Sequence, residues 1–206
     1  MIRNILILTI FGGMLFFTAC AKTGPIPDVD KGSVEAGGSV TFKGKSMNLL
    51  GNPIVIGKPL PSVKLTEAES MKIVDLSQEK GKVLFLSIVP SIETKVCEAQ
   101  THYLGEKGNK LPATVQRITI SRDTPFAQMR FAKEAKLQNI KYLSDYREGE
   151  FGLATGLLID DLRLLARTIV LVDKAGIIRY IQVVPEITRI PDMEKAFDEA
   201  QKIVHE

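Results

Sequence analysis

The sequence predicts one α/β domain, in which helices flank a central sheet of mixed strand direction and a β-hairpin lies at the N-terminal edge. Three observations predict this class. Apolar strand-like runs alternate with helical patterns along most of the chain. The last two strand-like runs are joined by the turn "KAG", which makes them antiparallel. The 206 residues, 45% hydrophobic and 25% charged, are enough to form a single core.

Residues 1–19 are predicted to be an export signal outside the fold. The stretch "MIRNILILTIFGGMLFFTAC" has one Arg near its start, then an uncharged apolar run, then small residues before a cysteine. This is the layout of a bacterial signal peptide. An uncleaved membrane anchor is the alternative, but the apolar run is at the short end of what spans a bilayer. We therefore expect an exported protein of the cell envelope or periplasm.

The end of this segment resembles a lipoprotein signal. Thr18 and Ala19 fit the small positions before the cleavage point, and Cys20 stands where the acylated cysteine would be. The resemblance implies a lipid anchor on Cys20 and attachment to a membrane. Residues 20–39 contain Gly, Pro and Ser with few large apolar side chains, so we expect them to form a flexible tether between the anchor and the domain.

The folded domain is expected to comprise residues 40–206. Its first part, residues 40–61, has two short apolar stretches, "VTF" and "PIVI", separated by the turn-prone "LLGNP", and predicts the hairpin. The next strand, at 82–89, is apolar except for Lys82 and Ser87, which is typical of a sheet buried on both faces. Strands are predicted at 82–89, 114–121, 167–173 and 177–184, and helices at 97–111, 125–136 and 191–204. A thioredoxin-like fold satisfies this order of elements.

Cys97 is the candidate nucleophile. It falls in the first turn of a helix that follows the strand at 82–89, where unpaired backbone N–H groups and the helix dipole favour a thiolate. If Cys20 carries lipid, Cys97 is the one free thiol of the mature chain. One alternative is a disulfide between the two cysteines, which an oxidising envelope permits although it closes no compact loop. The other alternative is a buried, unreactive cysteine.

The spacing Pro90-x-x-x-Thr94-x-x-Cys97 resembles the active-site loop of a peroxiredoxin. Three longer stretches, "SRDTPFAQMRF", "LLARTIVLVD" and "PEITRIPDMEKA", follow in the order of one subfamily, the bacterial thiol peroxidases. This resemblance runs from about Val40 to the C-terminus. It implies a thioredoxin-like fold, a homodimer and a hydroperoxide substrate, with no metal and no bound organic cofactor.

The resemblance also implies a role for each residue of the site. Cys97 attacks the peroxide and becomes a sulfenic acid, and the Thr94 hydroxyl binds the sulfur and the peroxide. Pro90 shields the pocket from water. Arg167 pairs with the thiolate and polarises the peroxide, for which its permanent charge and forked donors are suited. Singly, Pro90 could end a strand, Thr94 could cap the helix and Arg167 could lie on the surface, so their joint occurrence carries the hypothesis.

The chain departs from the subfamily at the second, resolving cysteine, because Ala132 occupies the matching position in the helix after "PFAQ". The expected activity is therefore that of a one-cysteine thiol peroxidase for antioxidant defence. It would reduce hydrogen peroxide and alkyl or lipid hydroperoxides with an external thiol, such as a thioredoxin-like protein. A sulfenic acid without a resolving partner is open to further oxidation. The alternative is thus a non-catalytic envelope redox sensor or thiol-binding lipoprotein.

Several other functions are disfavoured by composition and motifs. The net charge of +3 is small and the Lys and Arg residues are scattered, which leaves no basic stripe for nucleic acid. His102 and His205 are isolated, whereas zinc needs about four N or S ligands. The sequence has no Gly-rich phosphate loop, and it lacks the Cys-x-x-Cys pair of a thioredoxin-type disulfide exchanger.

Overall fold

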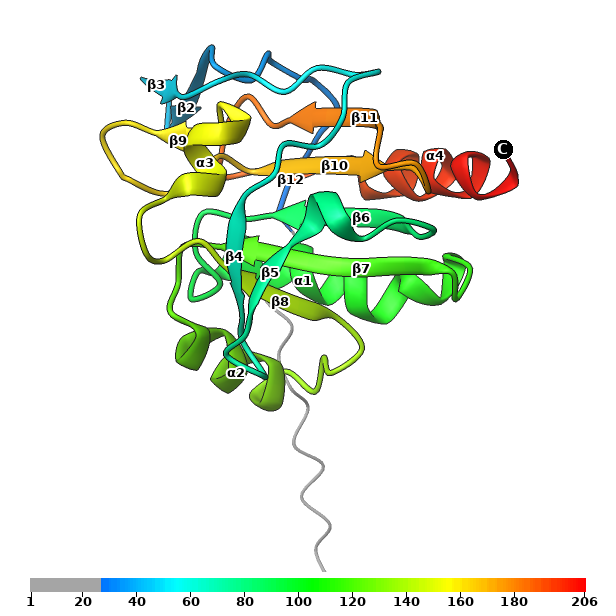
Figure 1. Cartoon of the computed structure of the whole chain (residues 1–206). Coiled ribbons are helices and arrows are strands. Elements are labelled where there is room, and N and C mark those ends of the chain that lie inside the picture. The colour runs from blue at the N-terminus through cyan, green and yellow to red at the C-terminus, as the bar shows by residue number, and fades with distance from the viewer. Residues whose placement is uncertain (1–26) are drawn as a thin grey trace, which may run out of the picture.

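The computed structural model describes residues 27–206, and a seven-stranded sheet lies at its centre (Figure 1). Strands β6, β7 and β8 run parallel, whereas β10, β11, β4 and β5 pair with their neighbours in the antiparallel sense. The predicted mixed sheet is confirmed. The sheet order is β11 (Ile178–Val183), β10 (Thr168–Val172), β6 (Val83–Ile88), β7 (Val115–Ser121), β8 (Lys141–Ser144), β4 (Lys64–Glu67) and β5 (Ile73–Asp75).

The remaining elements surround this sheet. The helices are α1 (Lys95–Lys107), α2 (Pro125–Glu134), α3 (Glu150–Thr155) and α4 (Met193–His205), with 3-10 turns η1 (Leu76–Gln78) and η2 (Gly108–Lys110). Two small sheets complete the fold. One has the order β2 (Ser39–Phe42), β3 (Lys45–Leu50) and β9 (Leu158–Ile159), and the other pairs β1 (Val29–Asp30) with β12 (Ile190–Pro191). The three long helices and the four long strands predicted from the sequence are all present, with shifts of a few residues at their ends.

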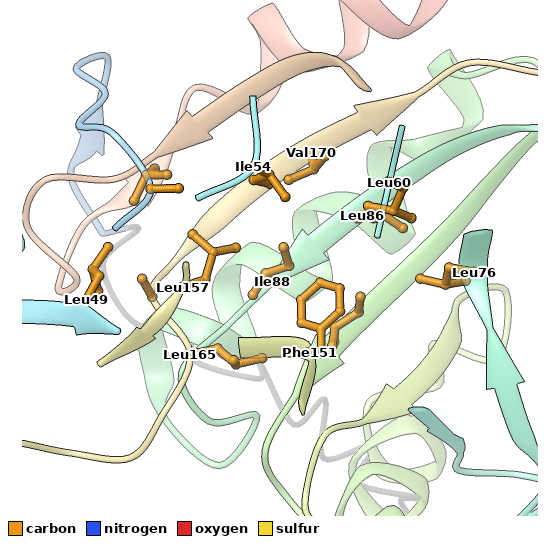
Figure 2. Close-up of a cluster of buried hydrophobic side chains, with 14 of the residues drawn as sticks. Leu49, Ile54, Leu60, Leu76, Leu86, Ile88, Phe151, Leu157, Leu165 and Val170 are labelled. Atoms are coloured by element: carbon orange, nitrogen blue, oxygen red, sulfur yellow. The ribbon is translucent and has the colours of Figure 1, made fainter. Parts of the chain in front are cut away.

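Both faces of the sheet are covered. On one face the side chains of α1, α2 and α4 pack against the strands, and the rings of Phe85 and Phe197 lie 5.5 Å apart between their centroids. On the other face Phe151 of α3 lies near Ile88 of β6, in a buried cluster that also contains Leu86 (Figure 2). Every residue of β6 is consequently buried, which accounts for its continuous apolar sequence.

The N-terminal hairpin forms, but its second strand is not the predicted one. The two-residue turn is Lys43–Gly44, with φ values of 51° and 81°. Positive φ at both positions matches the twist of the flanking strands. The stretch at 53–56, which we expected to be a strand, is irregular. The chain turns away at Gly51, whose φ is 110° and where a Cβ would lie 2.0 Å from a backbone oxygen of α3.

The folded domain begins earlier than the predicted residue 40, so the expectation that residues 20–39 form a flexible tether is wrong for its second half. Val29–Asp30 pair in parallel with β12. The N–H of Gly37 donates a 2.8 Å hydrogen bond to the carbonyl of Gly156, just beyond α3. Composition misses this because the segment is held largely by backbone hydrogen bonds, which leave no periodic apolar pattern in the sequence.

The predicted signal segment and the lipid-attachment residue Cys20 lie outside the described residues. Their assignments therefore stay predictions. Within residues 27–206, no helix combines the length and the apolar character needed to cross a bilayer.

Candidate active site

Cys97 is the third residue of α1, just past the carboxyl end of β6. Thr94 is the N-cap, with extended backbone at φ −109° and ψ 144°, and its carbonyl accepts the first helical hydrogen bond, from Glu98 N at 2.8 Å. The first N–H groups of a helix have no partner within it, so this turn carries partial positive charge. The Cys97 side chain is a free thiol and is completely buried.

Arg167 reaches the sulfur from the start of β10. Because β10 is antiparallel to β6, with Thr168 opposite Ile88, the beginning of one strand lies beside the end of the other. The guanidinium Nη2 donates to Cys97 Sγ at 3.3 Å. The structure therefore brings together two residues that are 70 positions apart in the sequence, as the hypothesis requires.

The environment of Arg167 is unusual for a charged side chain. Arg167 is only 1% exposed. Its Nη1 donates to Gln100 Oε1 at 2.7 Å and its Nε donates to the Ile187 carbonyl at 2.9 Å. Within residues 27–206 no carboxylate lies within ion-pair distance of it. A buried charge without a counter-charge is costly, and the Cys97 sulfur is the one contacting group that can become an anion. The site thus places a permanent cation against the Cys97 sulfur.

Gln100 completes this buried polar group, and sequence reasoning did not single it out. It lies one turn after Cys97 on α1 and is fully buried. Its Oε1 accepts from Arg167, while its Nε2 donates to Ser87 Oγ in β6 at 2.8 Å. The signal was available, because a spacing of three places both side chains on the same helical face, and a polar residue there needs a buried partner.

Pro90 and Thr94 lie in the loop that joins β6 to α1, as predicted. Pro90 is buried, which is compatible with a shielding role. Thr94 is exposed, and its hydroxyl donates to the Ser91 carbonyl at 3.2 Å instead of to the Cys97 sulfur. The expected contact of Thr94 with the sulfur is thus absent from this structure, and its contact with a peroxide stays a prediction.

Asp123 fixes the loop between β6 and α1, and the sequence alone did not single this residue out. Its carboxylate accepts from Ser91 Oγ at 2.7 Å and from the backbone N–H of Ile92 at 2.6 Å. Asp123 follows β7, the parallel neighbour of β6, so the ends of the two strands meet at one edge of the sheet. The signal in the sequence was an acidic residue two positions after the end of a predicted buried strand, inside the stretch "SRDTPFAQMRF".

The structure also places the other residues discussed for the site. Ala132 is buried on α2, in the same apolar cluster as Cys97. The ring of His102 lies on α1, where its Nδ1 is 2.8 Å from Glu106 Oε1, and His205 ends α4. Among residues 27–206, no group of three or more His, Cys, Asp or Glu side chains is placed to hold a metal ion.

Comparison with known proteins finds similar sequences and similar folds. Residues 56–197 match the Redoxin family model. A thiol peroxidase of Halalkalibacterium halodurans is 42% identical over 163 residues, which are 79% of this chain and 97% of that protein. A thiol peroxidase of Bacillus subtilis is 38% identical over 165 residues, covering 80% and 98%. The crystal structure of a peroxiredoxin-like protein from Aquifex aeolicus superposes with a TM-score of 0.76 at 30% identity, covering 82% of this chain and 98% of that one.

Three observations together define the class of protein. They are the thioredoxin-like fold, the buried Cys97–Arg167 pair and the family match over most of the domain. The chain belongs to the Redoxin family. Within that family its curated relatives at this identity are thiol peroxidases, and it is an enzyme of that kind, a peroxidase that reduces peroxides.

Proposed function

We propose that the protein reduces hydrogen peroxide and alkyl or lipid hydroperoxides through Cys97, by a one-cysteine mechanism, in antioxidant defence of the cell envelope. The observation that carries the mechanism is the buried guanidinium of Arg167, which contacts the Cys97 sulfur at 3.3 Å and has no carboxylate partner in the described chain. Such a site stabilises a sulfur anion and presents a permanent cation beside it.

The Cys97 thiolate attacks the terminal oxygen of ROOH in line with the O–O bond. A new S–O bond forms, the O–O bond breaks, and the sulfur is oxidised by two electrons to a sulfenic acid. The peroxide hydrogen stays on the transferred oxygen as S–OH, and the leaving RO⁻ takes a proton from solvent water and departs as an alcohol, or as water when R is hydrogen. Charge moves from sulfur to the leaving oxygen during this step, and a preorganised guanidinium stabilises that charge.

Regeneration then requires thiols from outside the chain. An external thiol attacks the sulfenic sulfur, which releases water and leaves a mixed disulfide, and a second thiol frees Cys97. This order is supported by the cysteine content, because the only other cysteine is Cys20, at the predicted lipid site. A thioredoxin-like protein, with two adjacent thiols, can perform both steps.

Stopped-flow measurement of the full-length protein tests the first step. One equivalent of hydrogen peroxide is added, thiol loss is followed, and Cys97 is trapped as sulfenic acid for mass spectrometry. We expect consumption much faster than for free cysteine, and none in Cys97→Ser. A rate equal to that of free cysteine, or equal rates in the two proteins, would rule out a peroxidase working through Cys97. Repeating the assay with a lipid hydroperoxide tests the wider substrate range.

The proposed location rests on the sequence of residues 1–20. We propose export and lipidation of Cys20, which would keep the domain near oxidised lipid in a membrane. In the native bacterium the wild type should sediment with membranes and Cys20→Ser should not. Equal distribution would contradict the anchor. We also propose a homodimer, which light scattering on the purified protein would show as twice the chain mass.

A redox sensor is the second candidate function, and one observation favours it. Cys97 is fully buried and is the one cysteine among the described residues, so its sulfenic acid has no resolving partner there. Turnover separates the two functions. With thioredoxin-like reductant in excess, a peroxidase consumes many equivalents of peroxide per Cys97, whereas a sensor consumes about one and then reports its oxidised state.

A further inference from the structure

Arg167 is oriented in part by a carbonyl outside the helix that carries Cys97. Its Nε donates to the Ile187 carbonyl at 2.9 Å, in the connection between β11 and β12. A guanidinium is planar, so this bond and the one to Gln100 fix the direction in which Nη2 meets the sulfur. The position of the Ile187 carbonyl therefore matters for the reacting pair.

The N-terminal hairpin holds this connection in place. Thr41 of β2 forms a parallel bridge with Glu186. The N–H of Thr41 donates to the Pro185 carbonyl at 2.7 Å, and the N–H of Ile187 donates to the Thr41 carbonyl at 3.0 Å. The hairpin thus pairs with the backbone on both sides of Glu186.

The Glu186 side chain strengthens this attachment. Its carboxylate accepts from the Thr41 hydroxyl at 2.9 Å and from the backbone N–H groups of Lys43 and Gly44, each at 3.1 Å. It also accepts from Thr188 through the N–H at 3.1 Å and the hydroxyl at 2.8 Å. One carboxylate therefore binds the turn of the hairpin and the connection that orients Arg167.

These contacts keep Glu186 ionised. Burial acts to raise the pKa of Glu186, but the hydrogen bonds it accepts outweigh burial and lower the pKa from 4.5 to about 2. The attachment is therefore intact at neutral pH. Five hydrogen bonds converge on this partly buried carboxylate from both segments, which points to a role in holding the two segments together.

We propose that Glu186 is a positioning residue for the Cys97–Arg167 pair, acting through the hairpin turn and the Ile187 carbonyl. Without its charge the bonds from Lys43 and Gly44 weaken, and the Ile187 carbonyl is less firmly fixed as an acceptor for the guanidinium. A displacement of about 1 Å at a reacting group costs on the order of 100-fold in rate. This role rests on the peroxide reaction proposed for Cys97.

The test compares Glu186→Gln with wild type as full-length proteins. Glu69→Gln is the matched control, because Glu69 is exposed and makes no side-chain hydrogen bond in the described structure. We expect the second-order rate with hydrogen peroxide to fall by roughly 10- to 100-fold in Glu186→Gln and to be unchanged in Glu69→Gln. In NMR spectra the Arg167 Nε–H should exchange with solvent faster in Glu186→Gln alone, whereas a general loss of stability would also accelerate exchange of the protected backbone amides of the central sheet.

A rate within twofold of a fast wild type, with the Arg167 Nε–H still protected, would overturn the role of Glu186. If Glu186→Gln does not fold, Thr41→Val and Thr41→Ser decide, since only the serine variant keeps the hydroxyl donor to Glu186. A slow valine variant beside a near-normal serine variant supports the proposal, and equal rates overturn it. A wild-type peroxide rate no faster than that of free cysteine would instead refute the proposed function. The exchange rate of the Arg167 Nε–H would then still show whether Glu186 positions the guanidinium.

Discussion

Replacing Gln100 by leucine should destabilise the protein and slow its reaction with peroxide. The leucine is close in size but removes both hydrogen bonds that Gln100 makes, one from Arg167 Nη1 at 2.7 Å and one to Ser87 Oγ at 2.8 Å. Both partners are buried, so their polar atoms cannot turn to solvent without a rearrangement.

The magnitude follows from these two bonds. A hydrogen bond to a charged group contributes about 1.5–3 kcal/mol, and a neutral one about 1 kcal/mol. The added apolar burial of leucine returns about 1 kcal/mol. The expected net loss in the free energy of unfolding is therefore about 1.5–3 kcal/mol. The peroxide rate should fall as well, because Gln100 is one of the acceptors that orient the Arg167 guanidinium.

Urea denaturation of the two proteins measures the loss as a lower transition midpoint with an unchanged slope. Gln138→Leu is the matched control, since Gln138 is exposed and its change should stay within about 0.5 kcal/mol. A loss in Gln100→Leu as small as in this control would refute the reasoning. It would mean that solvent reaches Arg167 freely and that the site is not sealed.

Three further predictions concern the groups around the site. Arg167→Lys keeps the charge but cannot serve three acceptors in one plane, so the peroxide rate should fall by about 100-fold or more; a near-normal stopped-flow rate would show that charge alone suffices. Asp123→Ala removes the acceptor for the loop before α1, so backbone amide hydrogen exchange at residues 91–94 should accelerate. The free energy of unfolding should fall by about 1.5–3 kcal/mol. Unchanged amide exchange would contradict this prediction. The pKa of Glu186 is lower in the folded protein than its ordinary 4.5, so its contribution to stability is present above pH 4.5 and is lost as the pH falls toward about 2. Urea titrations at a series of pH values should show this loss in the free energy of unfolding of the wild type and a weaker pH dependence in Glu186→Gln. Parallel pH dependences in the two proteins would contradict the prediction.

Much of the fold could be predicted because long elements have a strong periodic signal. The buried strand β6 is apolar at every position except Ser87, and α2 and α4 begin at clear capping residues, Thr124 and Asp192. The elements that were missed are short. β4, β5 and β8 have four residues or fewer, and α3 has six, so no period can be read from them.

The hairpin shows why local patterns mislead. The apolar stretch at 53–56 resembled a strand more than the mixed sequence of β3 did, yet β3 forms because the Lys43–Gly44 turn fits a two-residue hairpin. Gly51 then ends the pairing where the backbone of α3 approaches. The turn type depends on backbone dihedral angles, and the close approach depends on a segment about 100 residues further on.

The candidate site likewise has a part that is local in the sequence and a part that depends on the tertiary structure. The sequence by itself predicted Cys97, in the first turn of a helix, as the candidate nucleophile and, through the resemblance of its motifs, its pairing with Arg167. Helix starts and motif spacings are local, so one chain segment contains them. Only the tertiary structure showed that Gln100, Asp123 and the Ile187 carbonyl hold the pair and its loop. Those contacts depend on which strand ends lie side by side, and strand order is set by the packing of the whole sheet.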